Sequence, residues 1–281
     1  MCNSKINTMT YYMKSLVLIL LCLVSSSLWA EEGFPGRVKY PQVPYVELLA
    51  MYQERDNSVI IDARSPYEFQ TLRIKNAVNV PLILPPKKFK EKITALHDAN
   101  PGKKLIFYCN GHKCMKSYKA ARRVIVYMGL KNVYAFDAGI FDWAQTYPDE
   151  ALLLGRVLND PAKLISKADF KKHILPAKKF IKSASSSVEI LDIRDRIERD
   201  GFYIFSGEEK SISLNAKEKA KLDKFLRNVK KDDKTLYVYD MVGKQVRWFQ
   251  YYLESKKIEN YYFMKGGADA FFTIPLAELV D

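Results

Sequence analysis

Cysteine is scarce in this chain of 281 residues, which contains four. Two of them, Cys2 and Cys22, lie near the N-terminus, so the rest of the chain holds only Cys109 and Cys114. Two cysteines five positions apart are not the disulfide framework that stabilises small exported domains. The pair therefore indicates either thiol chemistry or one local bridge.

The sequence also lacks a hydrophobic segment long enough to span a membrane comfortably. The apolar run at residues 16–24 follows Lys14 and precedes Ala30, which is typical of a secretory signal rather than of a spanning helix. We therefore expect a signal peptide over residues 1–30, a periplasmic or secreted protein, and no stable membrane span after cleavage. An uncleaved membrane anchor is the alternative interpretation.

Acidic residues are outnumbered, with 32 Asp and Glu against 45 Lys and Arg and a net charge of +13. The basic residues are scattered in pairs such as Lys87-Lys88 and Lys230-Lys231, and no single basic stripe is interleaved with aromatic residues. This dispersion predicts that the protein binds no nucleic acid. The excess of positive charge is compatible with a small anionic substrate.

Two halves of the chain repeat one plan. An Asp-x-Arg triplet follows an apolar strand in each half, starting at Asp62 and at Asp192, 130 positions later. A later strand ends at Cys109 in the first half and at Asp240 in the second, an offset of 131. Ordered matches at nearly one offset predict a tandem duplication.

Each half alternates short apolar strands with helical stretches, which predicts an α/β fold with parallel strands. We expect one domain over residues 31–150, a linker over 151–166 and a second domain over 167–281. Ligands bind outside the carboxyl ends of such strands, and Cys109 follows the strand expected at residues 104–108.

The loop after this strand favours a nucleophilic thiol at Cys109. A helix is expected at residues 117–128, so the loop places backbone N–H groups and a helix start beside the sulfur. Both features stabilise a thiolate or a persulfide anion. His112, Lys113 and Lys116 add positive charge nearby.

Four segments together resemble the rhodanese family. Its first signature is similar to residues 61–69 (Ile-Asp-Ala-Arg-Ser-Pro-Tyr-Glu-Phe), and the segment that follows this signature is similar to residues 74–81. Its active loop and helix are similar to residues 108–121, and its closing motif is similar to residues 139–148. The resemblance is strong over residues 41–150 and weak over 165–275. It implies two tandem rhodanese-like domains, each with a small parallel sheet flanked by helices.

The resemblance also implies thiosulfate sulfurtransferase-like chemistry without a cofactor. Cys109 would take sulfane sulfur from a small anionic donor such as thiosulfate, forming a persulfide, and pass it to an unidentified thiol or protein acceptor. Asp62, Arg64 and Glu68 would support the loop as an ion-pair network, the alternative being three exposed charges. The substrate and persulfide loop would comprise Asn110, Gly111, His112, Lys113, Cys114, Met115, Lys116 and Ser117.

The sequence departs from the family pattern in both halves. Cys114 occupies the place of an arginine that the family's loop commonly carries five residues after the cysteine. Asp240 stands where the first half has Cys109, and because an aspartate cannot carry sulfane sulfur, we expect a catalytically silent second domain.

Other interpretations use the same loop. Cys109 and Cys114 are compatible with thiol–disulfide exchange, or with a non-catalytic module that binds sulfur compounds or a partner. A phosphatase would need a phosphate-clamping arginine where Met115 stands. A metal site would have only Cys109, His112 and Cys114 as ligands, so no metal is expected.

Overall fold

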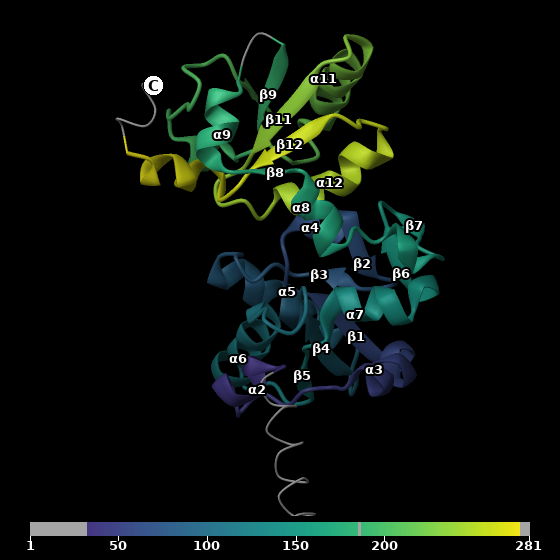
Figure 1. Ribbon diagram of the computed structural model, residues 1–281. Helices are drawn as coiled ribbons and strands as arrows, with labels where there is room; N and C mark the ends of the chain where they lie inside the picture. The colour runs from purple at the N-terminus through teal and green to yellow at the C-terminus, as the bar shows by residue number, and fades with distance from the viewer. Residues whose placement is uncertain (1–32, 185–186, 276–281) are drawn as a thin grey trace, which may run out of the picture. The chain divides into compact units, whose positions relative to one another are not determined.

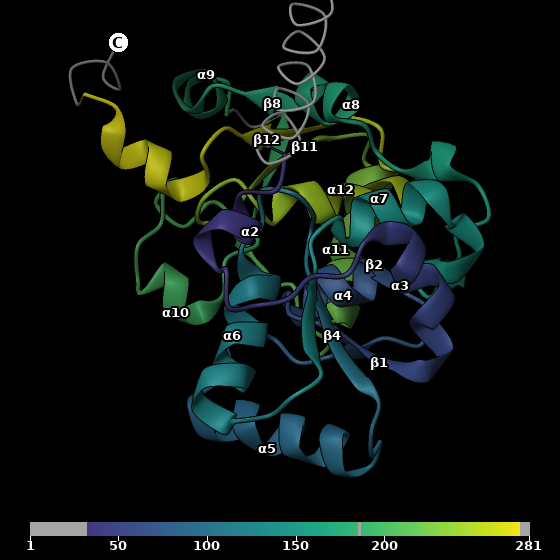
Figure 2. The same cartoon turned by 90° about the horizontal axis from the view of Figure 1, so that it is seen from below.

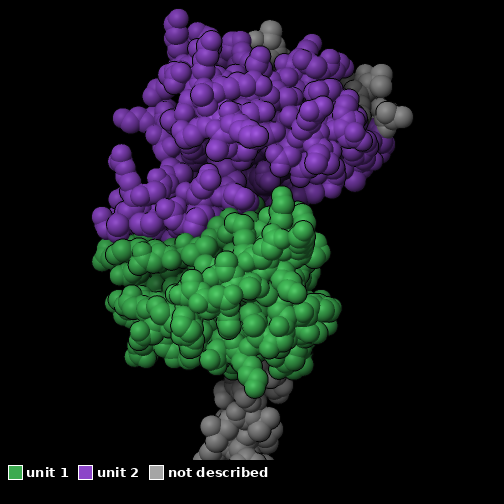
Figure 3. Space-filling model, turned by 180° about the vertical axis from the view of Figure 1, so that it is seen from behind, with its two compact units in different colours: residues 1–65, 74–151 green, residues 66–73, 152–281 purple. Residues whose placement is uncertain are grey.

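The computed structural model describes residues 33–184 and 187–275, and the expected signal peptide lies outside them. The chain divides into two compact units, which Figure 3 colours separately. Unit 1 comprises residues up to 65 together with 74–151, and unit 2 comprises residues 66–73 and those from 152 onward. Within the described ranges, no helix has both the length and the apolar character needed to cross a membrane.

Unit 1 is built on a parallel four-stranded sheet (Figure 1). Its strands, in spatial order, are β3 (Val78–Asn79), β1 (Ser58–Asp62), β4 (Lys104–Tyr108) and β5 (Val133–Phe136). Asp62 lies opposite Tyr108 in the register of β1 and β4. The residues that follow these two strands therefore meet at one edge of the sheet, as the sequence predicted.

Helices cover this sheet, among them α6, which begins one residue before its expected start. The helical segments of unit 1 are α2 (Pro35–Lys39), α3 (Leu48–Glu54), η1 (Arg55–Asn57), α5 (Pro86–Asp98), α6 (Lys116–Met128), α7 (Gly139–Thr146) and η2 (Pro148–Glu150). Phe89 of α5 and Val124 of α6 pack with Ile61 and Phe107 in one hydrophobic core. Figure 2 shows α5 and α6 side by side.

Unit 2 contains a parallel five-stranded sheet, which Figure 1 shows with helices around it. Its strands, in spatial order, are β10 (Lys210–Ser211), β9 (Val188–Asp192), β11 (Thr235–Tyr239), β12 (Tyr261–Met264) and β8 (Ile174–Leu175). Its helical segments are α4 (Pro66–Thr71), η3 (Pro161–Lys163), α8 (Lys167–Lys172), α9 (Ala177–Lys182), α10 (Arg196–Arg199), α11 (Lys219–Lys231), α12 (Val246–Ser255) and η4 (Gly267–Thr273). Phe249 of α12 and Leu226 of α11 pack with Val238 in its core.

The predicted linker contains regular structure. Strands β6 (Ala151–Leu153) and β7 (Arg156–Val157) form an antiparallel hairpin, and with β2 (Leu72–Ile74) they make a small third sheet. Leu154 and Gly155 have positive φ values of 50° and 84° at the turn. The domain and linker boundaries stay predictions.

The two larger sheets share one strand order, with β3-β1-β4-β5 answered by β10-β9-β11-β12. Corresponding backbone hydrogen bonds recur as well. The N–H of Ala63 donates to Tyr108 O over 3.0 Å, and that of Ile193 donates to Tyr239 O over 3.0 Å. The α/β class with parallel sheets and flanking helices is therefore confirmed, and the offset of about 130 residues corresponds to equivalent positions in the two sheets.

Candidate active site

Cys109 follows directly after β4 and is buried, with 1% of its surface exposed. Its carbonyl oxygen accepts a hydrogen bond of 2.9 Å from the N–H of Ile140, near the start of α7. The backbone of Cys109 is therefore tied on both sides, by the strand before it and by α7. The loop from Cys109 to Met115, here called the thiol loop, leads from this fixed point into α6.

Two glycines let the thiol loop lie directly against the start of α7. Gly111 has a φ of +135°, and a Cβ there would lie 2.7 Å from Ala138 O. Gly139 has a φ of +67°, and a Cβ there would lie 2.5 Å from the nitrogen of Gly111. Because both positions combine positive φ with backbone contact, only glycine fits them without displacing the loop.

A buried ion pair supports the start of the thiol loop. Asp62 and Arg64 are both fully buried, and the guanidinium contacts both carboxylate oxygens, with Nε 3.0 Å from Oδ1 and Nη2 2.6 Å from Oδ2. Arg64 Nη1 also donates to Asn110 Oδ1 over 3.2 Å. Burial excludes the alternative of exposed charges for this pair. Glu68 is buried in α4, and its part in the network stays a prediction.

The two thiols of the loop contact each other. Cys109 Sγ donates to the carbonyl oxygen of Cys114 over 3.1 Å and lies 3.5 Å from Ser117 Oγ. The thiols themselves lie within hydrogen-bonding reach. A turn closed by the N–H of Cys114 and the carbonyl of Gly111, 2.6 Å apart, brings Cys114 back over Cys109. Both cysteines are free thiols, with Cys109 buried and Cys114 partly exposed.

Their surroundings place the negative charge on Cys114. Burial raises the pKa of the Cys109 thiol well above its ordinary value. The pKa of Cys114 is lowered to about 6 by the hydrogen bond from Cys109, by the backbone N–H groups of Lys116 and Asn110, and by the charge of Lys116. These directions run against the thiolate expected at Cys109, which stays a prediction. Backbone N–H groups act on both sulfurs, those of Asn110 and Lys116 on Cys114 and that of Ser117 on Cys109.

The other loop residues lie around this pair. His112 is exposed, with Nε2 2.6 Å from Asp142 Oδ2 and its ring 4.4 Å from that of Phe34. Lys113 is exposed, and Met115 directly precedes α6. Lys116 and Ser117 begin α6, and Ser117 is fully buried.

Sequence reasoning missed Asp142 and Phe34 as neighbours of the loop. Asp142 lies in the segment compared with the closing motif, but nothing in its spacing indicated contact with His112. Over the described ranges, no group of three or more His, Cys, Asp and Glu residues is arranged to hold a metal ion.

Unit 2 has a related loop with a carboxylate at its start. Asp240 follows β11 and is buried, with 2% exposed. Its side chain accepts hydrogen bonds from the backbone N–H groups of Gly243, Gln245 and Val246 at the start of α12. Burial raises the pKa of Asp240, although these N–H groups act in the opposite direction. An anion thus occupies the cradle of N–H groups in this loop.

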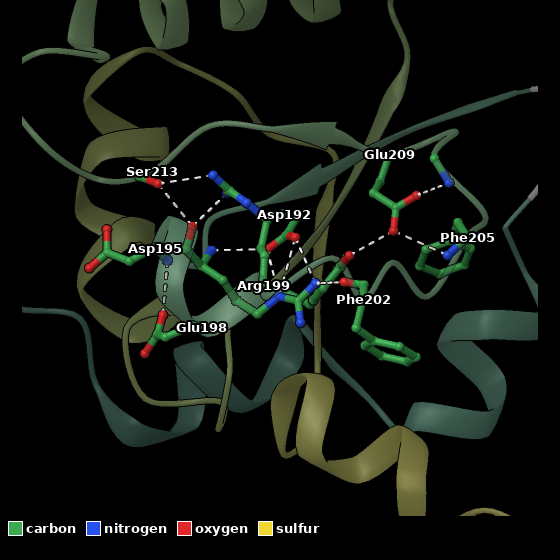
Figure 4. A network of polar contacts seen from close by, with 11 residues as sticks. Asp192, Asp195, Glu198, Arg199, Phe202, Phe205, Glu209 and Ser213 are labelled. Atoms are coloured by element: carbon green, nitrogen blue, oxygen red, sulfur yellow. Dashed lines mark hydrogen bonds and ion pairs between the residues drawn. The ribbon is translucent and has the colours of Figure 1, made fainter.

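The ion pair of unit 1 recurs beneath the loop of unit 2. Arg194 Nε and Nη2 donate to Asp192 over 3.0 and 2.9 Å. Figure 4 shows this pair's surroundings, in which Arg194 Nη2 also donates to Phe202 O over 2.7 Å. In the same view, the buried carboxylate of Glu209 accepts from the N–H of Phe205 over 3.1 Å. These contacts involve no thiol, and they lie within residues 192–209.

Unit 2 contains a cavity among its described residues. It has a volume of about 850 Å³, and all of its lining residues, including Tyr67, Lys219 and Tyr252, belong to unit 2. The thiol loop contributes no residue to its lining. This cavity therefore does not locate the chemistry suggested by the cysteines.

Unit 1 is an α/β domain with a cysteine site. Its two thiols lie on a loop between a parallel strand and a helix, and a buried ion pair anchors this loop. Residues 45–146 match the family model described as the rhodanese-like domain. The residues that match this model include Cys109 and Cys114.

Curated relatives match over a limited length. The chain is 38% identical to a tRNA uridine(34) hydroxylase of Cytophaga hutchinsonii over 92 residues, which cover 32% of this chain and 28% of that protein. A protein of the same name from Buchnera aphidicola is 32% identical over 105 residues, covering 36% and 31%. The chain thus spans about a third of the length of these relatives.

Solved structures also match the chain, but with low sequence identity. A thiosulfate sulfurtransferase from Pseudomonas aeruginosa is 18% identical, with a TM-score of 0.37, and the match covers 82% of this chain and 42% of that one. A rhodanese-related protein from Thermoplasma volcanium is 22% identical, with a TM-score of 0.30, covering 37% and 93%. Matches at this level do not carry residue roles from one chain to another.

Proposed function

We propose that this protein is a sulfurtransferase that moves sulfane sulfur from a small anionic donor, such as thiosulfate, through a persulfide on Cys109. The observation that carries the proposal is the position of Cys109 at the carboxyl end of β4, within the residues that match the rhodanese-like domain, with its Sγ 3.1 Å from the carbonyl oxygen of Cys114. The thiol of Cys114, whose pKa is lowered to about 6, is a base that can remove the proton of this buried nucleophile.

The reaction with the donor has two steps, a proton transfer and a sulfur transfer. The Cys114 thiolate takes the proton of Cys109 as the donor anion approaches. The Cys109 thiolate then attacks the outer sulfur of thiosulfate, the S–S bond of thiosulfate breaks, and sulfite leaves with the bonding electron pair. Lys113 and Lys116 supply positive charge on the loop, which favours the approach of an anion.

The persulfide then passes its outer sulfur to an acceptor nucleophile, a thiol or a protein that the sequence does not identify. The signal expected over residues 1–30 supports a periplasmic or secreted location for this reaction. We propose unit 2 as a degenerate rhodanese-like copy, because it repeats the strand order and the Asp-x-Arg pair of unit 1. Asp240 fills its anion cradle and cannot carry sulfur.

The contact between Cys109 and Cys114 also favours a second candidate, thiol–disulfide exchange. In that case the pair would cycle between two thiols and one local disulfide, with a partner protein as the oxidant or reductant. This candidate predicts oxidation of the pair without any dependence on a sulfane sulfur donor. It is therefore separable from sulfur transfer by the choice of reactant.

Sulfur transfer is tested by incubating the full chain and its Cys109→Ser and Cys114→Ser variants with thiosulfate, then measuring sulfite and intact mass. We expect the Cys114→Ser variant to release sulfite more slowly than the wild type, because it lacks the base, and to gain the mass of one sulfur atom, because its persulfide has no neighbouring thiol. We expect Cys109→Ser to do neither. Absence of both signals from the wild type and from Cys114→Ser would reject the proposed function.

A further inference from the structure

The thiol loop contains a second nucleophile that the transfer of sulfur through Cys109 does not consume. Cys114 is partly exposed, whereas Cys109 beneath it is buried. The turn between Gly111 and Cys114 directs the second thiol toward the first, and Cys109 Sγ lies 3.1 Å from the Cys114 carbonyl. A sulfur atom added to Cys109 would therefore form beside the sulfur of Cys114.

Unit 2 shows what the cradle of such a loop holds. There the N–H groups at the start of α12 bind the carboxylate of Asp240. In unit 1, the N–H group of Asn110, next to Cys109, and that of Lys116, at the start of α6, lower the pKa of Cys114. Both cradles thus hold an anion supplied by the chain, but the anion of unit 1 is a thiolate and can react.

We propose that Cys114 is a resolving cysteine, which attacks the Cys109 persulfide, forms a Cys109–Cys114 disulfide and releases hydrosulfide. This inference rests on the proposed function, because it needs the persulfide as its substrate. It makes sulfide a product of the protein. It also makes a dithiol reductant the partner that restores both cysteines after each turnover.

The reaction balances without a further oxidant. The proton that Cys114 took from Cys109 first passes to the outer sulfur of the persulfide, which leaves Cys114 as a thiolate. This thiolate attacks the inner sulfur of Cys109–S–SH, a new S–S bond forms between the two cysteines, and the original S–S bond breaks. The outer sulfur leaves as HS⁻ with the electron pair of the broken bond. The persulfide sulfur is thereby reduced to sulfide, and the two cysteine thiols are oxidised to a disulfide.

The anchoring of the loop suits this reaction. The carbonyl of Cys109 is held by Ile140 N, and Asn110 is held by Arg64, so the persulfide-bearing residue stays in place. The resolving thiol lies beyond Gly111, on the half of the loop that leads into α6. Closure of the disulfide therefore needs movement only between Gly111 and Cys114, a span in which neither His112 nor Lys113 is buried.

The test is a single turnover of the reduced full chain with thiosulfate in the absence of any external thiol. Sulfite, sulfide and the state of the cysteines are measured for the wild type, Cys114→Ser and Cys114→Ala. Trypsin cleaves after Lys113, between the two cysteines, so a Cys109–Cys114 bridge joins two peptides that separate on reduction. The smaller alanine variant guards against a folding defect specific to serine.

We expect the wild type to release sulfite and sulfide in equal amounts and to yield the joined peptides. Both Cys114 variants should release sulfite without sulfide, more slowly than the wild type because they lack the base, and should keep the additional sulfur on the peptide that contains Cys109. A wild type that retains the persulfide without sulfide, or variants that release sulfide as the wild type does, would overturn the resolving role while sulfur transfer stands. Loss of sulfite from all three proteins would instead reject the proposed function itself.

Discussion

Replacement of Arg64 by lysine should weaken the fold and also change the chemistry of the thiol loop. Arg64 and Arg194 hold Asp62 and Asp192 with nearly the same geometry, with Nη2 to Oδ2 distances of 2.6 and 2.9 Å. Arg64 additionally donates to Asn110 in the thiol loop. Arg194→Lys is therefore a matched control that disturbs an equivalent ion pair in unit 2, where the loop has no cysteine.

The expected loss of stability follows from the hydrogen bonds. Lysine keeps the positive charge but lacks the planar fork that reaches both carboxylate oxygens. Each variant loses about two charge-assisted hydrogen bonds worth about 1.5 kcal/mol each, so the free energy of unfolding of the affected unit should fall by about 3 kcal/mol. The arginine-to-lysine change should lower the free energy of unfolding by a similar amount in both units.

The chemical consequence separates the two variants. The N–H of Asn110 is one of the groups that lower the pKa of Cys114 to about 6, so loss of the Arg64 anchor should raise this pKa toward the ordinary thiol value of about 8.5. With a pKa of about 6, Cys114 is a thiolate at neutral pH and loses reactivity as the pH falls through 6. In Arg64→Lys the same loss should occur at higher pH.

The measurement is the rate of Cys114 alkylation by iodoacetamide as a function of pH, followed on tryptic peptides and accompanied by urea unfolding. The wild type and Arg194→Lys should share one pH midpoint, and that of Arg64→Lys should be higher. The reasoning is refuted if Arg64→Lys loses stability but keeps the wild-type midpoint. It is also refuted if Arg194→Lys shifts the midpoint equally.

Two further substitutions test the loops. Asp240→Ala removes the acceptor of three backbone N–H groups. At about 1 kcal/mol for each orphaned donor, it should lower the free energy of unfolding of unit 2 by about 3 kcal/mol. The control Asp269→Ala, at an exposed position, should change this free energy by less than about 0.5 kcal/mol. Gly139→Ala places a Cβ 2.5 Å from Gly111 N and should abolish the sulfur gain from thiosulfate in the Cys114→Ser background. Gly155→Ala also has a positive φ but no atom within 4 Å, so it should cost only about 1 kcal/mol of backbone strain and leave sulfur gain intact.

The sequence indicated the sheet because buried parallel strands are short apolar runs with a polar residue at the end. Strand β4 and helix α6 were found in this way, and the position of Cys109 after β4 followed from them. The pairing of Asp62 with Arg64 was also predictable, since the two residues are two positions apart where β1 ends. These features depend on local pattern and on the common edge of parallel strands.

The electrostatics of the thiol loop were not predictable in the same way. Which thiol faces the N–H groups depends on the turn between Gly111 and Cys114 and on the φ of +135° at Gly111. Periodicity carries no information about either. The contact of His112 with Asp142 joins residues 30 positions apart, so it depends on how α7 packs against the loop.

The two loops of the chain show why a cysteine at the end of β4 does not by itself determine the chemistry. Each loop gathers backbone N–H groups around one anion, which is Asp240 in unit 2 and Cys114 in unit 1. The carboxylate of Asp240 stays hydrogen-bonded to its N–H groups, because it neither accepts sulfur nor leaves. The thiolate of Cys114 stays with its N–H groups only until a persulfide forms on Cys109. The thiolate is then a nucleophile in contact with an electrophilic sulfur. If the Cys114 variants hold their persulfide and the wild type does not, the anion that stabilises the resting loop is also the group that ends the reaction.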